Sequence, residues 1–331
     1  VSTLILHLSD FHFNSAAASL ALRSRQLVAA ALSRVERVSD VHIVASGDLA
    51  NRGENSEFDL AHDFLSSVSN EFERSISVSP EIMICAGNHD CDFTVDQSLR
   101  NLVLKGIGSD GAISNSVAQA LSTPLEGFFA LQSRLNPRVE RINPWCSRVA
   151  TNGAVPVEYF LINSSVCSTV RESPGKLIVP TNSIPEPSTG GRVVFVMHHP
   201  LNWLDHENAR ALAQLAATNA DLFLMGHEHE LVGQLSTDLY TGNGVAVMKG
   251  HVLFHSSGSE DSGFHVVHLD PDMGFITYAY RWSDTKYEPW EQKSTPDYSP
   301  WCTGNGNGKL ALSLKVMQTL DSVGANFTHR K

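Results

Sequence analysis

Residues 220–229 read Ala-Asp-Leu-Phe-Leu-Met-Gly-His-Glu-His, a short apolar run that ends in a glycine and two histidines. The apolar part is typical of a buried strand. Side chains two positions apart leave an extended backbone on the same side, so His227 and His229 can point at one target. Neutral imidazole is a common metal ligand, and Gly226 lets the backbone turn and approach closely. The stretch therefore predicts a metal site at the end of a strand.

Four apolar segments earlier in the chain end in the same kind of residues. They are 3–8 before Asp10-Phe11-His12, 40–46 before Gly47-Asp48, 82–85 before Gly87-Asn88-His89-Asp90, and 193–197 before His198-His199-Pro200. Helical patterns at 16–38 and 58–68 separate the first three segments, which is the βαβ pattern. In open α/β sheets, sites form where the strands end, so the five motifs are expected to meet.

The rest of the chain is read more coarsely. Segments 98–103, 112–121 and 125–135 fit helices, and we interpret residues 92–152 as an inserted helical cap. Strands are expected at 159–163, 244–248, 263–269 and 275–282, a surface loop at 173–191, and a helix at 207–217. Residues 291–331 form a linker-like C-terminal tail, and a second hypothesis is that they lead to a further domain of a longer protein.

Composition excludes some classes of function. The chain has 331 residues, 42% of them hydrophobic and 18% charged, which suits one large globular domain or two ordinary ones. The net charge of −11 argues against a surface that grips a long polyanion, although bound cations could still allow nucleic acid. Five cysteines without paired spacing indicate reduced thiols and a cytoplasmic protein, and no apolar run is long enough to span a bilayer.

The five motifs, in this order, resemble the calcineurin-like metallophosphoesterase superfamily, and the resemblance covers residues 4–230. In motif pattern they are closest to the bacterial class III cyclic nucleotide phosphodiesterase-like members. The resemblance implies a four-layer α/β/β/α sandwich, in which helices flank two mixed sheets and a helical cap is inserted. Residues 1–290 would form the catalytic domain.

The resemblance also implies a dinuclear metal site. One ion would be held by Asp10, His12, Asp48 and His229, and the second by Asp48, Asn88, His198 and His227, with Asp48 between them. A shared carboxylate suits two cations a few ångströms apart. Nitrogen and oxygen donors without thiolate favour divalent transition metals. Mn²⁺ is the first expectation, and Fe, Zn, Co and Ni are alternatives.

The expected reaction is attack of a metal-bridging hydroxide on phosphorus. His89 matches the family histidine that stabilises the transition state or protonates the leaving oxygen. Either Asp90 or Asn51 would orient His89, and Arg52 is a candidate phosphate clamp. Residues 47–53 resemble a segment of the protein phosphatase branch, but Asn51 stands where that branch has Asp, which weakens an assignment to that branch.

Several residues also have a simpler interpretation, in which they are structural or exchange roles with a neighbour. His199 could replace His198 as the ligand, and Arg52 could be an ordinary exposed salt-bridging arginine. Trp203 and His206 could line the substrate mouth, but a packing cluster in which Asp205 caps a helix is favoured. His251 and His255 are read as structural, and Cys85 and Cys91 as buried small hydrophobes.

The expected function is hydrolysis of a phosphodiester, with a small molecule or nucleotide as the substrate and no role for a membrane. The alternatives are a phosphomonoesterase acting on a nucleotide or phosphoprotein, a nuclease, and an inert binding scaffold. Substrate choice in this superfamily lies in caps and loops. Here those are residues 92–152 and 165–190, and neither carries a motif that names the ester.

Overall fold

The computed structural model describes residues 2–14, 23–95, 98–107, 114–188, 190–237, 243–253, 262–270 and 274–290. The predicted C-terminal tail, 291–331, lies outside the described residues. Among the helices in the described part of the chain, none has the length and hydrophobicity needed to cross a membrane.

The first sheet contains the strands that carry the first three motifs. Its spatial order is β13 (Lys286–Pro289), β12 (Gly274–Ser283), β11 (Gly263–Asp270), β1 (Ser2–Leu8), β2 (Val38–Ala45) and β3 (Glu81–Ile84). Strands β1, β2 and β3 are parallel, whereas β11, β12 and β13 pair antiparallel. The carboxyl ends of the three parallel strands therefore lie at one edge of the sheet.

The second sheet contains the strands that carry the two histidine motifs. Its order is β4 (Glu140–Asn143), β5 (Cys146–Thr151), β6 (Val157–Ile162), β7 (Arg192–Met197), β8 (Leu222–Met225), β10 (Gly244–Lys249) and β9 (Val232–Thr237). Strands β6, β7, β8 and β10 are parallel, and the outer pairs are antiparallel. Both sheets are thus mixed.

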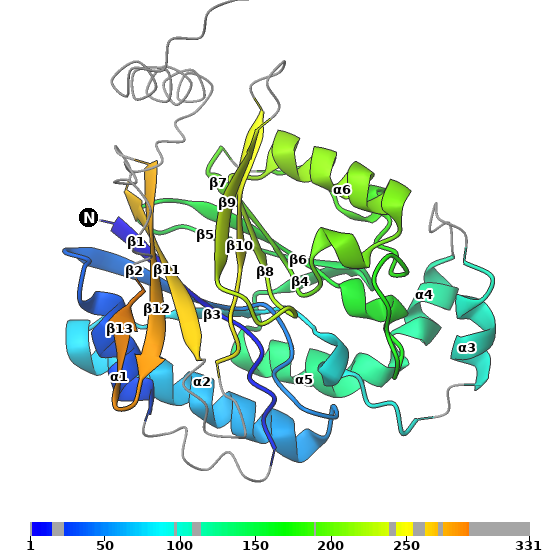
Figure 1. The fold of residues 1–331 in the computed structure, drawn as a ribbon, viewed down its shortest axis with the longest axis horizontal. Coiled ribbons are helices and arrows are strands. Elements are labelled where there is room, and N and C mark those ends of the chain that lie inside the picture. Colours follow the sequence, from blue (N-terminus) through cyan, green and yellow to red (C-terminus); the bar gives the residue numbers. More distant parts are fainter. Residues whose placement is uncertain are drawn as a thin grey trace, which may run out of the picture.

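Helices cover the outer faces of the two sheets (Figure 1). The bounds are α1 (Arg23–Leu32), α2 (Asn55–Ile76), α3 (Ser98–Leu104), α4 (Asn115–Leu121), α5 (Glu126–Leu135) and α6 (His206–Asn219). Apolar residues of α1, α2 and α5 share one core with the first sheet, those of α6 share a second core with the second sheet, and a third core lies between the sheets. The predicted four-layer α/β/β/α fold is confirmed.

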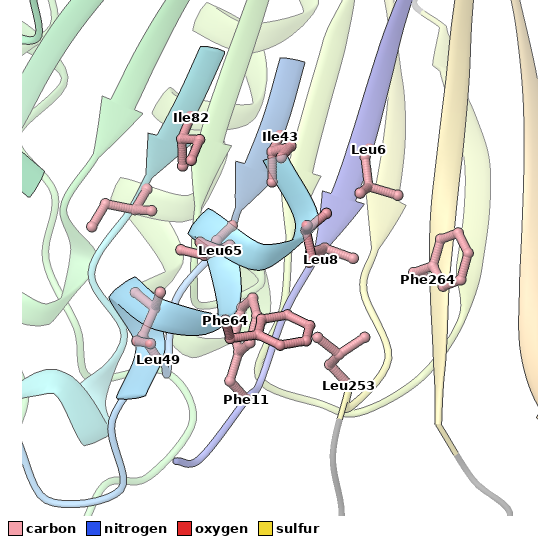
Figure 2. Packing of buried hydrophobic residues seen from close by; sticks show 14 of the residues in the cluster. Leu6, Leu8, Phe11, Ile43, Leu49, Phe64, Leu65, Ile82, Leu253 and Phe264 are labelled. Atoms are coloured by element: carbon pink, nitrogen blue, oxygen red, sulfur yellow. The ribbon is translucent and has the colours of Figure 1, made fainter. Parts of the chain in front are cut away.

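The amphipathic stripe of α2 explains how the first sheet is covered. Phe64 packs against Phe11, and both Phe64 and Leu65 belong to one buried cluster with Leu8 and Ile43 of the sheet (Figure 2). The helix is longer than the predicted 58–68, because Phe72 continues the buried stripe to a further turn. Each fully buried Phe or Leu contributes about 1.5–3 kcal/mol, so this face anchors the layer.

The segment between β3 and β6 is more than a helical cap. The three predicted helices correspond to α3, α4 and α5, but β4 and β5 also lie inside residues 92–152 and extend the second sheet. β4 is mostly exposed, and β5 mixes apolar and polar residues, so neither short strand has the apolar run that would have revealed it in the sequence. Helix α1 ends at Leu32, earlier than predicted, since β2 begins at Val38.

Candidate metal centre

The first cluster of predicted ligands forms where the end of β1 meets the end of β8. The Nε2 atoms of His12 and His229 are 3.3 Å apart, and His229 Nε2 is 3.3 Å from Asp10 Oδ1. His12 Nε2 is also 3.9 Å from one oxygen of Asp10 and 3.9 Å from one oxygen of Asp48. Four predicted ligands from three loops thus surround one point.

The second cluster joins the ends of β2, β3, β7 and β8. The Nδ1 atom of His227 is 3.1 Å from Asn88 Oδ1 and 3.2 Å from His198 Nε2. His198 Nε2 is 3.2 Å from Asp48 Oδ2. The structure therefore brings all seven predicted ligands together.

Asp48 lies between the two clusters. Its Oδ1 accepts a hydrogen bond from the backbone N–H of His89 at 2.8 Å, while Oδ2 faces His12 and His198. Burial acts to raise the pKa of Asp48, but His198, together with His12 and His89, outweighs it and holds that pKa well below its usual range. The buried carboxylate is therefore an anion, as a bridging ligand must be.

The donor chemistry fits divalent transition metal ions. Histidine nitrogens and carboxylate or amide oxygens of both clusters converge, and the His and Asp members form groups whose donor atoms lie within 4.8 Å of one another. Burial lowers the pKa of His227 to about 3, which keeps this imidazole neutral. Burial also disfavours a charge on His198, but Asp48 raises its pKa to about 10, so a bound cation would displace a proton there.

Two glycines allow the motifs to approach one another. A Cβ on Gly226 would lie 2.0 Å from Ser9 Oγ and 2.9 Å from Asp10 Oδ2. A Cβ on Gly87 would lie 2.1 Å from Asp48 Oδ1. Any larger residue at these positions would displace a predicted ligand, which is why each motif has glycine there.

Two serines, Ser9 and Ser46, support the clusters, although no motif in the sequence points to them. Ser9 Oγ donates to Asp10 Oδ2 at 2.5 Å and accepts from Ser46 Oγ at 2.9 Å. The Ser46 hydroxyl also contacts His7 Nε2 at 2.9 Å, and the Ser46 carbonyl accepts from His198 Nδ1 at 2.9 Å. Their only sequence signal is that they directly precede the Asp10 and Gly47-Asp48 motifs.

His89 lies beside the first cluster with one nitrogen fixed. Its Nδ1 donates to the backbone carbonyl of Asn51 at 2.8 Å, and its ring contacts that of His12 edge-on at 4.7 Å. Asp90 does not contact His89 through its carboxylate. Its two oxygens accept from the backbone N–H groups of Ala50 and Gly87, both at 2.8 Å, and so tie two motif loops together.

Arg52 is exposed and forms no ion pair with any residue that the structure describes. Its backbone N–H donates to Glu57 Oε2 at 2.7 Å, as does the N–H of Asn51 at 3.1 Å. Glu57 at the start of α2 therefore holds this loop in place. Among the described residues, the guanidinium therefore lacks the salt bridge that the alternative interpretation of Arg52 requires.

The choice between His198 and His199 has a clear geometric basis. His198 Nε2 faces Asp48, whereas His199 is fully buried and its ring nitrogens face Ser164 and Glu172. Trp203 lies against the ring of His227, with 4.1 Å between centroids, so it belongs to the surroundings of the site.

The remaining candidates have structural places. Asp205 accepts from the N–H of Glu207 and caps α6, as predicted, and His206 is the first residue of that helix. His251 is half-buried beside Val252, and His255 lies outside the described residues. Cys85 and Cys91 are buried, with pKa values raised by burial, as expected of inert thiols.

Several solved structures match the chain at low similarity. Vacuolar Protein Sorting 29 from Cryptosporidium parvum is 13% identical, over 87% of this chain and 96% of its own, with a TM-score of 0.37. A 5'-nucleotidase precursor from Thermus thermophilus is 12% identical over 97% and 59%, with a TM-score of 0.40. A phosphopantetheinyl hydrolase from Mycobacterium tuberculosis is 13% identical over 76% and 90%, with a TM-score of 0.35. Likeness at this level does not extend to activity.

No curated protein sequence matches the chain. The model of the calcineurin-like phosphoesterase family, in contrast, matches residues 3–231, from β1 to just beyond His229. That stretch contains all five motifs and both clusters. Because the match covers more than half of the sequence, the chain belongs to the calcineurin-like phosphoesterase family, and this membership supports metal-dependent hydrolysis of a phosphoester.

Proposed function

We propose that the protein hydrolyses a phosphodiester at a dinuclear metal site. The observation that carries this proposal is the position of Asp48, whose anionic carboxylate lies between two clusters of nitrogen and oxygen donors. Asp10, His12, Asp48 and His229 would hold one ion, and Asp48, Asn88, His198 and His227 the other. The family is typically dimetal-dependent, which supports the same assignment.

Mn²⁺ is the metal that we propose first, with Fe, Zn, Co and Ni as alternatives. The donors are imidazole, carboxylate and amide groups, and no cysteine in the described residues belongs to either cluster. When bound, two such cations supply charge stabilisation to the phosphoryl oxygens and make water a nucleophile near neutral pH.

His89 would carry the proton transfer to the leaving group. The carbonyl of Asn51 holds the hydrogen of Nδ1, which leaves Nε2 as the atom that binds or releases a proton. The ring lies edge-on to His12, next to the first cluster. A proton held at Nε2 would therefore be positioned to protonate the leaving oxygen of a phosphoester bound between the clusters.

The preference for a diester over a monoester follows the motif pattern, because two bound cations would supply most of the positive charge for either ester. A phosphodiester carries one negative charge, and a phosphomonoester dianion needs more compensation. Lys249, close to the motif of His227, is paired with Glu228, so it offers little net charge. Arg52 remains as an exposed cation beside the motif loops. Its planar guanidinium matches the geometry of phosphate oxygens and would add to the charge of the cations.

The test compares two esters with the same leaving group. With Mn²⁺ added, bis-p-nitrophenyl phosphate should be hydrolysed faster than p-nitrophenyl phosphate, and Asp48→Ala should abolish the rate and most of the bound metal. Faster hydrolysis of the monoester would replace the diester assignment by a phosphomonoesterase. Protein that binds no transition metal and cleaves neither ester would favour the scaffold.

A further inference from the structure

A buried hydrogen-bonded chain lies behind the second cluster. Ser164 Oγ is 2.8 Å from His199 Nδ1, and His199 Nε2 is 3.0 Å from Glu172 Oε2. Ser164 and His199 have no exposed surface, and the side chain of Glu172 is 7% exposed. None of the three belongs to the predicted ligands, so the chain requires a reason of its own.

The hydrogen bonds fix the imidazole in one orientation. The backbone N–H of His199 points at Ser164 Oγ, at 3.4 Å, and the hydroxyl hydrogen is thereby directed to Nδ1. Nδ1 then accepts, so Nε2 carries the hydrogen and donates it to the carboxylate of Glu172. Both ring nitrogens are satisfied, and the ring cannot rotate without breaking both bonds.

The ring of His199, held in this orientation, packs against two predicted ligands, His198 and His227. The ring centroid of His199 is 4.5 Å from that of His227 and 4.9 Å from that of His198. Neither contact is a hydrogen bond, so the coupling is steric. If the His199 ring turned, both neighbouring imidazoles would lose the surface against which they pack.

The loop that supplies Glu172 contacts the site a second time. The N–H groups of Gly175 and Lys176 donate to the carbonyls of Asn202 and Trp203, both at 3.0 Å. Trp203 in turn packs edge-on against the ring of His227. Residues 168–176 therefore contact the surroundings of the second cluster at two places, the ring of His199 and the carbonyl of Trp203, although they carry no predicted ligand themselves.

We propose that Glu172 is a positioning residue for the metal centre. By holding His199, it fixes the imidazoles of His198 and His227 and so sets how tightly the second cluster binds a divalent transition cation. The proposal rests on the proposed function, because it requires that cluster to be a metal site. Part of the metal affinity of that site would then depend on the loop between β6 and β7.

The test is metal affinity, measured by titrating metal-free protein with Co²⁺ and following both heat and the visible absorption of the bound ion. Direct partners of a ligand typically contribute 10–100-fold in affinity, and Glu172 acts one step further away through His199, so Glu172→Ala should weaken one of two equivalents by about 10-fold, the lower end of that range. Glu172→Gln should recover most of the loss, because its amide oxygen still accepts from Nε2. Glu186→Ala is the matched control, since the exposed Glu186 lies in the same connection and contacts Asn219 instead.

The outcomes of this titration distinguish the positioning role of Glu172 from the proposed function. A folded Glu172→Ala protein that binds both equivalents as the wild type does would overturn the positioning role while leaving the proposed function intact. If that variant does not fold, Ser164→Ala removes the partner of the other ring nitrogen, and unchanged binding by Ser164→Ala would overturn the role equally. Wild-type protein that binds no Co²⁺ would remove the proposed function itself.

Discussion

At the scale of single residues, His89 is the group whose loss should separate chemistry from metal binding. Replacing it by asparagine removes the proton donor but keeps the backbone N–H that contacts Asp48. We expect kcat to fall by about 10²–10⁴-fold, the usual contribution of a positioned acid, with metal content unchanged. Steady-state kinetics and metal analysis of the same preparation check this.

Leaving groups of different basicity provide the control for His89. A nitrophenolate leaves without a proton, whereas an alkoxide needs one, so His89→Asn should lose more activity on an alkyl ester than on a nitrophenyl ester. Equal losses on both esters would mean that His89 stabilises the phosphoryl group and does not protonate the leaving oxygen.

The residues that could be predicted from the sequence are those whose chemical type is itself the signal. Asp10, His12 and Asp48 stand out because carboxylates and imidazoles rarely follow buried strands without a reason. Ser164 and Glu172 carry no such signal, since serine and glutamate are common in loops. Their partner His199 is 27 or more residues away in sequence, and only the folded chain brings the three together.

At the scale of elements, the turns after the strands hold strained backbone. Five predicted ligands have positive φ, between 47° and 72°: Asp10, His12, Asp48, His227 and His229. Each such residue costs of the order of 1–3 kcal/mol and persists only when its surroundings enforce it. Hydrogen bonds between loops enforce it here, since the N–H groups of Phe11 and His12 both donate to the Asp48 carbonyl. The sequence predicted where the turns lie but not their conformation.

A glycine substitution tests how tightly these turns are packed. Gly226→Ala would place a Cβ 2.0 Å from Ser9 Oγ and must shift Asp10 or the turn. We expect weaker metal binding and a lower Tm, because displacing the serine also breaks its hydrogen bond to Asp10. Differential scanning fluorimetry with and without Mn²⁺ measures both effects.

Gly233→Ala is the matched control for this change. Gly233 lies in β9, and a Cβ there would have no other atom within 4 Å. Its Tm and its response to Mn²⁺ should match those of the wild type. If Gly226→Ala behaved like Gly233→Ala, the close approach of the β8 turn to Ser9 would not be needed for the site.

At the scale of the whole molecule, the site depends on how the two sheets pack together. Asp10, Asp48 and Asn88 follow strands of the first sheet, and the histidines after β7 and β8 come from the second. The four-layer arrangement could be predicted because the family motifs imply it. The pairing of β4 and β5 could not, because β4 is mostly exposed and β5, although mostly buried, lacks a continuous apolar run.

The sheets also meet in a polar contact away from the clusters. His42 of β2 is buried between the sheets, and its Nδ1 is 2.8 Å from the hydroxyl of Tyr159 in β6. Burial lowers the pKa of His42 from 6.5 to about 4. A histidine that is neutral in the folded protein but titrates normally in the unfolded chain makes stability depend on pH.

The sign of that dependence follows from proton counting. Between pH 6.5 and pH 4 the unfolded chain binds a proton at His42 that the folded protein does not, so acid favours unfolding. The contribution of His42 is fully present above pH 6.5 and is lost as the pH falls to about 4, for a total of about 3 kcal/mol. His42→Gln removes this proton while keeping a polar side chain that can face Tyr159.

Urea unfolding of metal-free protein at pH 7.5 and pH 4.5 measures the effect. Other buried histidines with lowered pKa values, such as His7 and His265, destabilise both proteins equally in acid, so their effect cancels in the comparison. The wild type should lose about 2–3 kcal/mol more than His42→Gln between the two pH values. If both proteins lost the same amount, His42 would be protonated in the folded state, and the contact between the sheets would have to admit a charge.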